Sequence, residues 1–279
     1  MCNAHVARTV SERVKKEGLP SVSRRSFFKL GSVLAAGAAL APQLARADMH
    51  GISEVVDLSH TLSPDNPVWP GVVTPGTRET VFTIEENFIY SQRWTFEEHQ
   101  GTHIDFPAHF IADGARVDAF PTDGLVGPAV VIDISARAQE DADALVTVDD
   151  LQAWEMENGE IPEGAFVLMY SGWEHRIGTP AFFGDDTGLH FPGFSGEAAN
   201  WLVSERSIHG VGVDTISLDH AITQTFDAHY AFLGSGLLGI ENIANLEAIM
   251  DSKATIVCGI PKYEEGSGGP ARILALTGM

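Results

Sequence analysis

The chain has 279 residues, of which 44% are hydrophobic and 20% are charged, and its formal net charge at pH 7 is −21. These proportions are those of a globular protein with enough apolar residues for a sizeable core. The acidic balance argues against nucleic acid as a partner, because the sequence has no basic patch to neutralise phosphates.

The N-terminal segment is predicted to be a twin-arginine export signal. Residues 23–29 have the sequence SRRSFFK, the apolar run 30–40 follows, and the small-residue cleavage site Ala45-Arg46-Ala47 comes next. The apolar run is too short to span a bilayer, which argues against a membrane anchor. We therefore expect residues 1–47 to be removed and residues 48–279 to form a single domain, without a membrane span, in a bacterial periplasm.

Loss of the signal would make the mature chain more acidic. Residues 1–47 hold eight of the 17 Lys and Arg residues and two of the 38 Asp and Glu residues, which leaves 9 against 36 and a formal charge of −27. The carboxylates are scattered, as on a well-solvated surface, rather than gathered in a binding tail. Cys258 would be the one cysteine left, so no internal disulfide is expected.

Strand-like segments outnumber helices in the mature chain. β-Rich apolar runs predict strands, and two helices are predicted from their first residues, where Thr147 with Asp150 forms a capping box and Ser195 is an N-cap. Residues 178–196 have the glycine and proline content of a long surface loop, which we expect to edge the pocket of the site described below. No thirty-residue βαβ repeat is visible, so we expect an α/β fold with a mixed, largely antiparallel sheet and flanking helices. The predicted strands cover residues 55–60, 80–86, 128–135, 165–171, 210–218, 254–259 and 273–277, and the predicted helices cover 147–157 and 197–205.

The densest chemistry lies in residues 99–110, HQGTHIDFPAHF, where three histidines and an aspartate fall within eleven positions. A single histidine in such a stretch is usually an ordinary, hydrogen-bonded core residue. Burying all four groups together without a cation would cost several kcal/mol, because an ionised carboxylate and its neighbours would be desolvated with no obvious partner. The pattern therefore favours a metal site.

An extended backbone would bring these groups together. Alternate side chains of a strand share a face, so His99, His103 and Asp105 would point the same way. Gly101 would leave room between the two imidazoles for an ion. Pro107 would end the strand and turn the rest of the segment back toward the same pocket.

Further positions carry alternative roles. Trp69 lies between two prolines on a stiff backbone, and from the residues alone its expected role is to cap the core. Asp214 and Thr215 end an apolar strand, a common place for site residues or for residues that orient them. Glu241 interrupts an apolar run, and a buried carboxylate needs a partner of opposite charge. That partner could belong to a metal site or to an ordinary structural salt bridge.

These features together resemble the putative cyclase family of metal-dependent hydrolases, which includes bacterial kynurenine formamidase and isatin hydrolase. The likeness runs through nearly the whole mature chain, and its most specific part is the family's H-x-G-T-H-x-D-x-P-x-H-F motif at residues 99–110. The other matching segments are Val56 to Ser59, Val68 to Gly71, Asp214 to Ser217 and His229 to Asn242.

The resemblance implies a role for each site residue. Asp105 would bridge two metal ions, Glu241 would be the second bridging carboxylate, and His109 would donate and accept protons. His229 is expected to be the remaining histidine ligand, because the spacing of the competing His220 to Glu241 does not match. The implied metal ligands are His99, His103, Asp105, His229 and Glu241.

The resemblance also implies features of the whole protein. The family's sheet is barrel-like, and its members assemble as dimers or tetramers, so we expect a homodimer or homotetramer. Trp69 would contact a small-molecule substrate.

The ligand set suits Zn²⁺ or Mn²⁺, with one or two ions per subunit. Such an ion lowers the pKa of a bound water to near 7 and polarises a carbonyl, and His109 would pass the proton to the leaving atom. We therefore predict a metal-dependent hydrolase that cleaves a C–N or C–O bond of a cyclic amide, lactone or related small carbonyl compound through a metal-bound hydroxide.

Two alternatives remain open at this point. Kynurenine formamidase is the first. Export argues against it, because the breakdown of tryptophan in which that enzyme acts is cytoplasmic. A non-catalytic periplasmic protein that binds a metal or small ligand is the second, although a proton-shuttling histidine would have no use there. A serine hydrolase is not expected, because the sequence has no G-x-S-x-G elbow.

Overall fold

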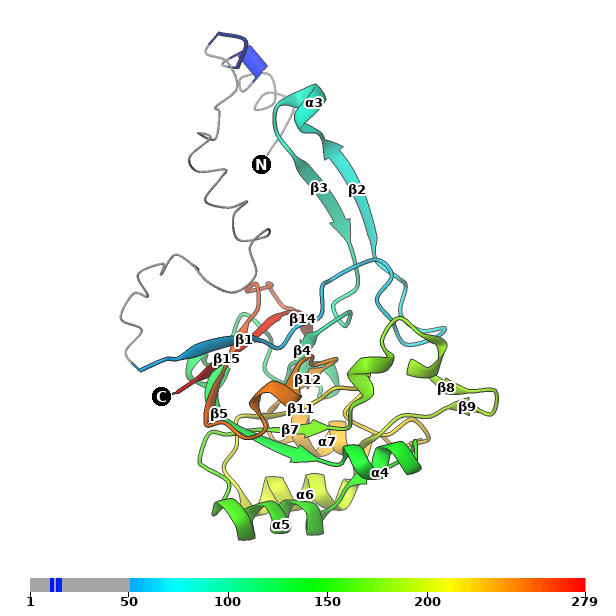
Figure 1. The fold of residues 1–279 in the computed structure, drawn as a ribbon, viewed down its shortest axis with the longest axis vertical. Helices are drawn as coiled ribbons and strands as arrows, with labels where there is room; N and C mark the ends of the chain where they lie inside the picture. Colours follow the sequence, from blue (N-terminus) through cyan, green and yellow to red (C-terminus); the bar gives the residue numbers. More distant parts are fainter. Residues whose placement is uncertain (1–10, 13, 17–50, 279) are drawn as a thin grey trace, which may run out of the picture. The chain divides into compact units, whose positions relative to one another are not determined.

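The computed structural model describes residues 11, 12, 14–16 and 51–278 (Figure 1). The predicted signal, residues 1–47, lies outside the described residues except for the five positions near its start. The chain divides into two compact units, one holding Thr77–Thr95 and the other holding the rest of 51–278. Within these described ranges, no helix is long and apolar enough to cross a bilayer.

The first unit is a hairpin of three elements, β2 (Thr77–Phe82), α3 (Ile84–Asn87) and β3 (Ser91–Thr95). The two strands pair antiparallel, with an irregular register near the tip. The predicted strand over 80–86 is therefore wrong beyond Phe82. The cause is Thr83, whose hydroxyl accepts a hydrogen bond from the backbone N–H of Glu86 and so caps a turn of helix.

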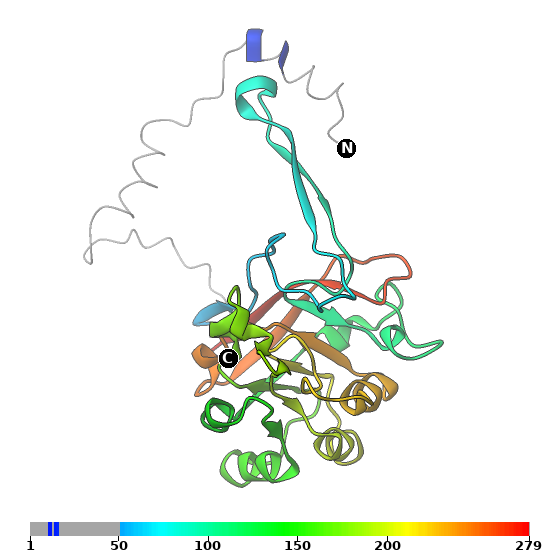
Figure 2. The same cartoon turned by 90° about the vertical axis from the view of Figure 1, so that its right-hand side faces the viewer.

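The second unit is built on a nine-stranded sheet that curls into a half-barrel (Figure 1, Figure 2). In the order of the sheet, the strands are β1 (Glu54–Asp57), β15 (Arg272–Thr277), β13 (Ala254–Gly259), β5 (Val126–Asp133), β7 (Phe166–Tyr170), β11 (Gly210–Val213), β12 (Leu238–Glu241), β4 (His103–Asp105) and β14 (Gly268–Pro270). Its four central strands, β5, β7, β11 and β12, run parallel to one another, and the strand pairs on either side of them are antiparallel. The predicted mixed, largely antiparallel sheet is thus confirmed.

The parallel centre contains three βαβ crossovers that the sequence did not reveal. The connections from β5 to β7, from β7 to β11 and from β11 to β12 differ in length, so no fixed period appears in the sequence. Each of them includes at least one helix, as is usual for a crossover between parallel strands. The helices of this unit are α4 (Ser135–Glu140), α5 (Val148–Asn158), α6 (Gly196–Glu205) and α7 (Asp227–Gly234).

Both predicted N-caps are confirmed. The Thr147 side chain accepts a hydrogen bond from the backbone of Asp150, whose carboxylate accepts one from the backbone of Thr147 in return, so α5 begins with a capping box. The Ser195 hydroxyl accepts a hydrogen bond from the backbone N–H of Ala198 at 3.0 Å and begins α6. Helix α5 ends before Gly159, which has a positive φ of 90°.

Residues 178–196 form more than a surface loop. Two of its phenylalanines, Phe182 and Phe191, are buried and pack with Trp173 and Ile216 in a small core. That packing explains why a glycine-rich segment holds a fixed path. The short elements in and around it are η3 (Trp173–Arg176), η4 (Pro180–Phe182), the antiparallel pair β8 (Gly184–Asp185) and β9 (Gly188–Leu189), and the parallel pair β6 (Leu145–Val146) and β10 (Gly193–Phe194).

The main apolar residues divide between the two faces of the sheet. One cluster joins the central strands to helices α5, α6 and α7 through residues such as Val167, Leu151 and Leu202. A second cluster contains Ile104 and Ile240, which are register partners in β4 and β12. The pairing of β4 with β12 brings the predicted metal segment, residues 99–110, beside Glu241. The remaining short helices are η1 (Pro107–His109), η2 (Thr122–Leu125) and η5 (Leu246–Ile249).

Candidate active site

The predicted metal segment is extended over only part of its length. Within the segment, His103 and Asp105 lie in strand β4, but the chain bends before it, at His99 and again at Gly101, where φ is +65°. A Cβ added at Gly101 would lie 3.1 Å from a methyl group of Leu62, so this glycine serves the backbone turn rather than making room between imidazoles. The prediction of one continuous strand is therefore wrong, because the left-handed turn is what redirects His99.

The structure brings the five predicted ligands together, with Asp105 shared between two groups of them. The Oδ1 atom of Asp105 lies 2.6 Å from His99 Nδ1 and 3.4 Å from His103 Nε2. Its Oδ2 atom lies 3.4 Å from His229 Nε2. Two overlapping groups that could hold a metal ion result, one of His99, His103 and Asp105 and the other of Asp105, His229 and Glu241.

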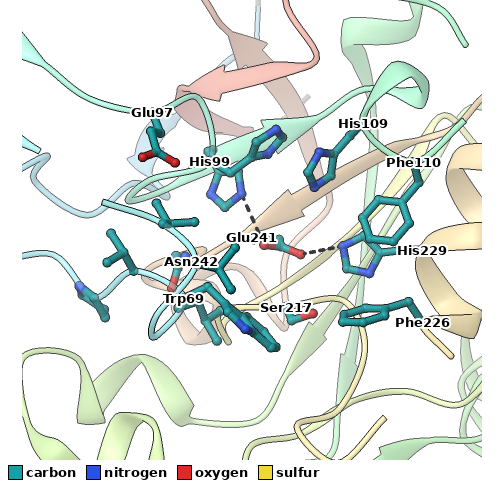
Figure 3. Close-up of a pocket in the computed structure, with 16 residues that line it drawn as sticks. Trp69, Glu97, His99, His109, Phe110, Ser217, Phe226, His229, Glu241 and Asn242 are labelled. Atoms are coloured by element: carbon teal, nitrogen blue, oxygen red, sulfur yellow. Dashed lines mark ion pairs between the residues drawn. The ribbon is translucent and has the colours of Figure 1, made fainter. Parts of the chain in front are cut away.

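Glu241 lies between two of the imidazoles. As register partner of His103 in the β4–β12 pair, it places Oε2 at 3.2 Å from His103 Nε2. Its Oε1 atom lies 3.2 Å from His229 Nε2, and Figure 3 shows this ion pair. The backbone N–H of Leu218 donates a hydrogen bond to Oε1 at 3.0 Å. Glu241 is 5% exposed, so its partners are these buried groups rather than solvent.

His229, and not His220, reaches the cluster. His229 lies in α7, and its Nδ1 atom is 2.6 Å from the carboxylate of Asp219, which also accepts hydrogen bonds from the backbone N–H groups of Ala228 and His229. A carboxylate in this position orients the ring and directs Nε2 toward the metal groups. Sequence reasoning missed the role of Asp219, although an acidic residue beside His220 in an apolar run was a usable signal.

Buried charges set the protonation of the cluster. Burial acts to raise the pKa of Asp105, but His99 and the other nearby imidazoles outweigh it and hold that pKa well below its usual range. Burial acts to lower the pKa of His103, whereas the carboxylates of Asp105 and Glu241 raise it to about 10. The pKa of His229 is raised in the same way, against the effect of burial. Without a cation, protonated imidazoles thus neutralise the carboxylates.

Two buried atoms fit a metal ion as their partner. His103 Nε2 and Asp105 Oδ2 have no hydrogen-bond partner among the described residues, although both face groups of opposite charge within 3.4 Å. Buried polar atoms are nearly always paired. A divalent cation would satisfy both atoms and would replace the protons on the imidazoles. The donor set of three imidazoles and two carboxylates suits such an ion.

His109 lies beside the cluster but outside both ligand groups. It belongs to η1, which begins at Pro107, and its ring stacks on His99 with centroids 3.7 Å apart. Burial lowers the pKa of His109; Asp105 and Glu241 act against this shift, and His99 and His229 add to it. The imidazole is therefore neutral near pH 7, with one ring nitrogen free to accept a proton.

A cavity of about 420 Å³ opens beside the cluster (Figure 3). Trp69, Phe110 and Phe226 give it aromatic walls, and Trp69 packs against Phe226 and the buried Phe191 with ring centroids 6.3 and 5.8 Å apart. Trp69 thus contacts the core and lines the cavity. Sequence reasoning missed Phe226, which lies just before α7 and had no metal-ligand chemistry to mark it. The other lining residues are Pro67, Val68, Val72, Val73, Glu97, His99, His103, His109, Ile216, Ser217, His229, Glu241 and Asn242.

Asp214 and Thr215 have structural roles. Strand β11 ends at Val213, and the Asp214 carboxylate accepts hydrogen bonds from Ser171 Oγ at 2.6 Å and from the backbone N–H of Trp173 at 2.9 Å. Burial raises the pKa of Asp214 to about 6. The Thr215 hydroxyl donates to the backbone carbonyl of Ser217. Neither residue lines the cavity.

Three imidazoles and two carboxylates, carried by a curled mixed sheet and the segments beside it, line an aromatic cavity and form a site that can hold metal. Together with the relatives described next, this site identifies the protein as a hydrolase. The chain belongs to the putative cyclase family, whose model matches residues 56–220.

Named relatives agree with this class. The chain is 32% identical over 246 residues to isatin hydrolase from Roseibium aggregatum, covering 82% of this chain and 93% of that protein. It is 29% identical over 221 residues to kynurenine formamidase from Bacillus cereus, covering 79% and 96%. The solved structure of isatin hydrolase A from Ralstonia solanacearum superposes with a TM-score of 0.77 at 37% identity, covering 86% of this chain and 99% of that one.

Proposed function

We propose that this protein hydrolyses the C–N bond of a cyclic amide joined to an aromatic ring, with lactone C–O bonds as related targets. The observation that carries the proposal is the ligand cluster around Asp105, which opens into a cavity walled by Trp69, Phe110 and Phe226. An aromatic cavity of this size suits a flat small molecule. The names of the isatin hydrolase relatives support the same substrate class.

The proposed cofactor is Zn²⁺ or Mn²⁺, as one or two ions per subunit. His99, His103 and Asp105 would hold one ion, and Asp105, His229 and Glu241 would hold a second. Imidazole with carboxylate ligands suits either metal. When bound, such an ion polarises a carbonyl and lowers the pKa of water.

The remaining residues of the site position the substrate and move protons. Trp69, Phe110 and Phe226 would hold the aromatic ring and exclude water from that side of the cavity. The neutral imidazole of His109 would accept a proton from the attacking water at its free ring nitrogen and return it to the leaving nitrogen. His109 suits this role because it lies beside the cluster without belonging to either ligand group.

Kynurenine formamidase activity is the second candidate. The relatives that carry this name are 28–29% identical over most of the chain, and a formylated aniline is also a flat aromatic amide. A non-catalytic binding protein is disfavoured, because the named relatives are hydrolases and a receptor has no use for His109 as a proton carrier.

A substrate panel tests the proposal. Protein loaded with Zn²⁺ or Mn²⁺ is assayed against isatin, N-formylkynurenine and an aromatic lactone, with chelated protein and an Asp105→Ala variant as controls. We expect the highest kcat/KM on isatin and no turnover in either control. Turnover of N-formylkynurenine alone would establish the second candidate, and turnover that survives chelation would refute a metal-dependent reaction.

We also propose export to the periplasm by the twin-arginine pathway. The support is the SRRSFFK sequence at residues 23–29 with the apolar run that follows. In a bacterial host, an Arg24→Lys/Arg25→Lys variant should remain in the cytoplasm while the parent chain is recovered from the periplasm. Equal distribution of the two proteins would contradict this proposal.

Assembly into a homodimer or homotetramer is the last part of the proposal. It rests on family resemblance, and light scattering of the mature chain would measure it directly. A monomeric mass at micromolar concentration would contradict it.

A further inference from the structure

Ser267 contacts the one ligand histidine that presents a different nitrogen to the site. His103 and His229 direct Nε2 toward Asp105 and Glu241, whereas His99 directs Nδ1 toward Asp105. The Nε2 atom of His99 therefore faces away from the cluster and lies 3.1 Å from Ser267 Oγ.

Glu98 determines the direction of that hydrogen bond. Ser267 Oγ lies 2.5 Å from Glu98 Oε2, and the backbone N–H of Ser267 donates to the same carboxylate at 3.2 Å. A hydroxyl has one proton to donate, and an ionised carboxylate can only accept. Ser267 thus donates to Glu98 and must accept from His99, which places a hydrogen on Nε2. In the structure without metal, Nδ1 shares a second hydrogen with Asp105 Oδ1 at 2.6 Å, and a metal ion would take the place of that hydrogen and bind Nδ1.

The backbone around Ser267 is fitted to this pair. Gly268 is the register partner of Asp105 in the β4–β14 pair, and a Cβ there would lie 2.6 Å from His99 Cε1. A Cβ at Gly266 would lie 3.1 Å from Glu98 Oε1. The segment from Gly266 to Gly268, which leads into β14, is therefore a close-fitting support for His99 and Glu98. Side chains added at Gly266 or Gly268 would displace Glu98 or His99.

We propose that Glu98 and Ser267 are positioning residues that fix the tautomer of His99, so that Nδ1 is the nitrogen presented to the metal. Because the His99 ring stacks on His109, the same hydrogen bonds also hold the proton carrier in place. This inference rests on the proposed function only in taking His99 as a metal ligand. The Ser267 hydroxyl does for His99 what the Gly101 carbonyl does for His103 and the Asp219 carboxylate does for His229: it accepts a hydrogen bond from the ring nitrogen that faces away from the site.

The test measures Zn²⁺ affinity by competition with a chelator, without substrate. Ser267→Ala should weaken Zn²⁺ binding about 10- to 100-fold, the loss usual when the acceptor of a ligand histidine is removed. Glu98→Ala, which removes the acceptor of the Ser267 hydroxyl, should weaken it less, and adding it to Ser267→Ala should cause little further loss, because Glu98 acts through the hydroxyl. Ser252→Ala is the matched control, since it removes a half-buried hydroxyl that donates to a backbone carbonyl elsewhere, and it should leave affinity unchanged.

A spectroscopic measurement separates positioning from general support of the fold. A long-range proton–nitrogen NMR spectrum of the Zn²⁺-loaded protein shows which nitrogen of each ring carries hydrogen. We expect hydrogen on Nε2 of His99 and on Nδ1 of His103 and His229, with the His99 pattern lost in Ser267→Ala.

Two results would overturn the inference: wild-type Zn²⁺ affinity in Ser267→Ala, or hydrogen on Nδ1 of His99 in the Zn²⁺-loaded parent protein. Circular dichroism checks that each variant folds, and if Ser267→Ala does not fold, an unchanged affinity in Glu98→Ala refutes the inference by itself. Failure of the proposed function would appear as absent turnover in the parent protein, which none of these measurements depends on.

Discussion

Asp105 is the residue on which both ligand groups depend. It is 1% exposed, and its two oxygens face three different imidazoles. An isolated buried carboxylate costs several kcal/mol. Asp105 can therefore stay ionised in the interior only because positive charge, from protonated imidazoles or from a metal ion, lies beside it.

His109 tests the division of roles at the level of single residues. His109→Ala should lower kcat by about 10²- to 10⁴-fold, the usual contribution of a general acid–base group. The metal content should not change, because His109 belongs to neither ligand group. Elemental analysis beside the kinetic assay measures both quantities, and loss of metal together with activity would show that His109 is a ligand.

Asp214 provides a test through pH. Its pKa is raised from an unfolded value near 3.8 to about 6 in the fold, so folding favours the protonated form. The stability that this gives is fully present below pH 3.8 and is lost as pH rises through about 6, a change of about 3 kcal/mol in the free energy of unfolding.

Denaturant unfolding of the parent and of Asp214→Asn across this pH range isolates that contribution. The free energy of unfolding of the parent minus that of the variant should fall as pH rises through about 6, because the side-chain amide of the variant does not titrate. A difference that is constant from pH 4 to pH 7 would contradict the assignment.

The linear motif could be predicted from sequence, whereas the residues that orient it could not. His99, His103 and Asp105 lie within seven positions, so their shared chemistry is visible without a fold. Asp219 and Ser267 are far from their partners in sequence, and a lone aspartate or serine carries no chemical pattern. Only the pairing of β14 with β4 and the position of α7 bring them to the histidines.

At the scale of elements, local signals predicted helix starts well. The capping residues of α5 and α6 act over three positions, so the sequence contains the whole interaction. Helix α7 had no such signal, because its N-cap residue Phe226 makes no side-chain hydrogen bond to the helix. Strand β14 is Gly-Gly-Pro, which lacks β-forming residues and exists because β4 pairs with it.

The capping box of α5 has a measurable energy. Thr147→Ala should lower the free energy of unfolding by about 1 kcal/mol, since it removes the hydroxyl that accepts the Asp150 N–H. Catalytic activity should remain, because α5 does not contribute to the cavity. Ser204→Ala, at an exposed position late in α6, serves as control and should change stability by less than about 0.5 kcal/mol. Equal stability of the two variants would contradict the role of the cap.

At the scale of the whole molecule, the metal centre connects segments far apart in sequence. Its ligand groups come from β4, α7 and β12 and from the bend at His99. An ion that binds the folded chain alone stabilises it by mass action. The parallel centre of the sheet, with its three crossovers, is what brings α7 and β12 beside the metal segment, and unequal crossover lengths are why sequence periodicity did not predict it.

Metal removal should therefore lower the melting temperature. At a free Zn²⁺ concentration about 100 times Kd the ion contributes about 2.7 kcal/mol, or roughly 5–10 °C in Tm for a domain of this size. Differential scanning calorimetry with and without chelator measures the shift. His109→Ala should keep it and Asp105→Ala should lose it, and a shift that Asp105→Ala retains would place the ion elsewhere.

Anomalous diffraction from crystals soaked in Zn²⁺ or Mn²⁺, recorded at the absorption edge of each metal, tests the central claim most directly. We predict a peak about 2.0–2.2 Å from Asp105 oxygen and from His99 Nδ1 and His103 Nε2, the usual distances for these ligands. A peak away from Asp105, or none in a crystal of active protein, would contradict the account.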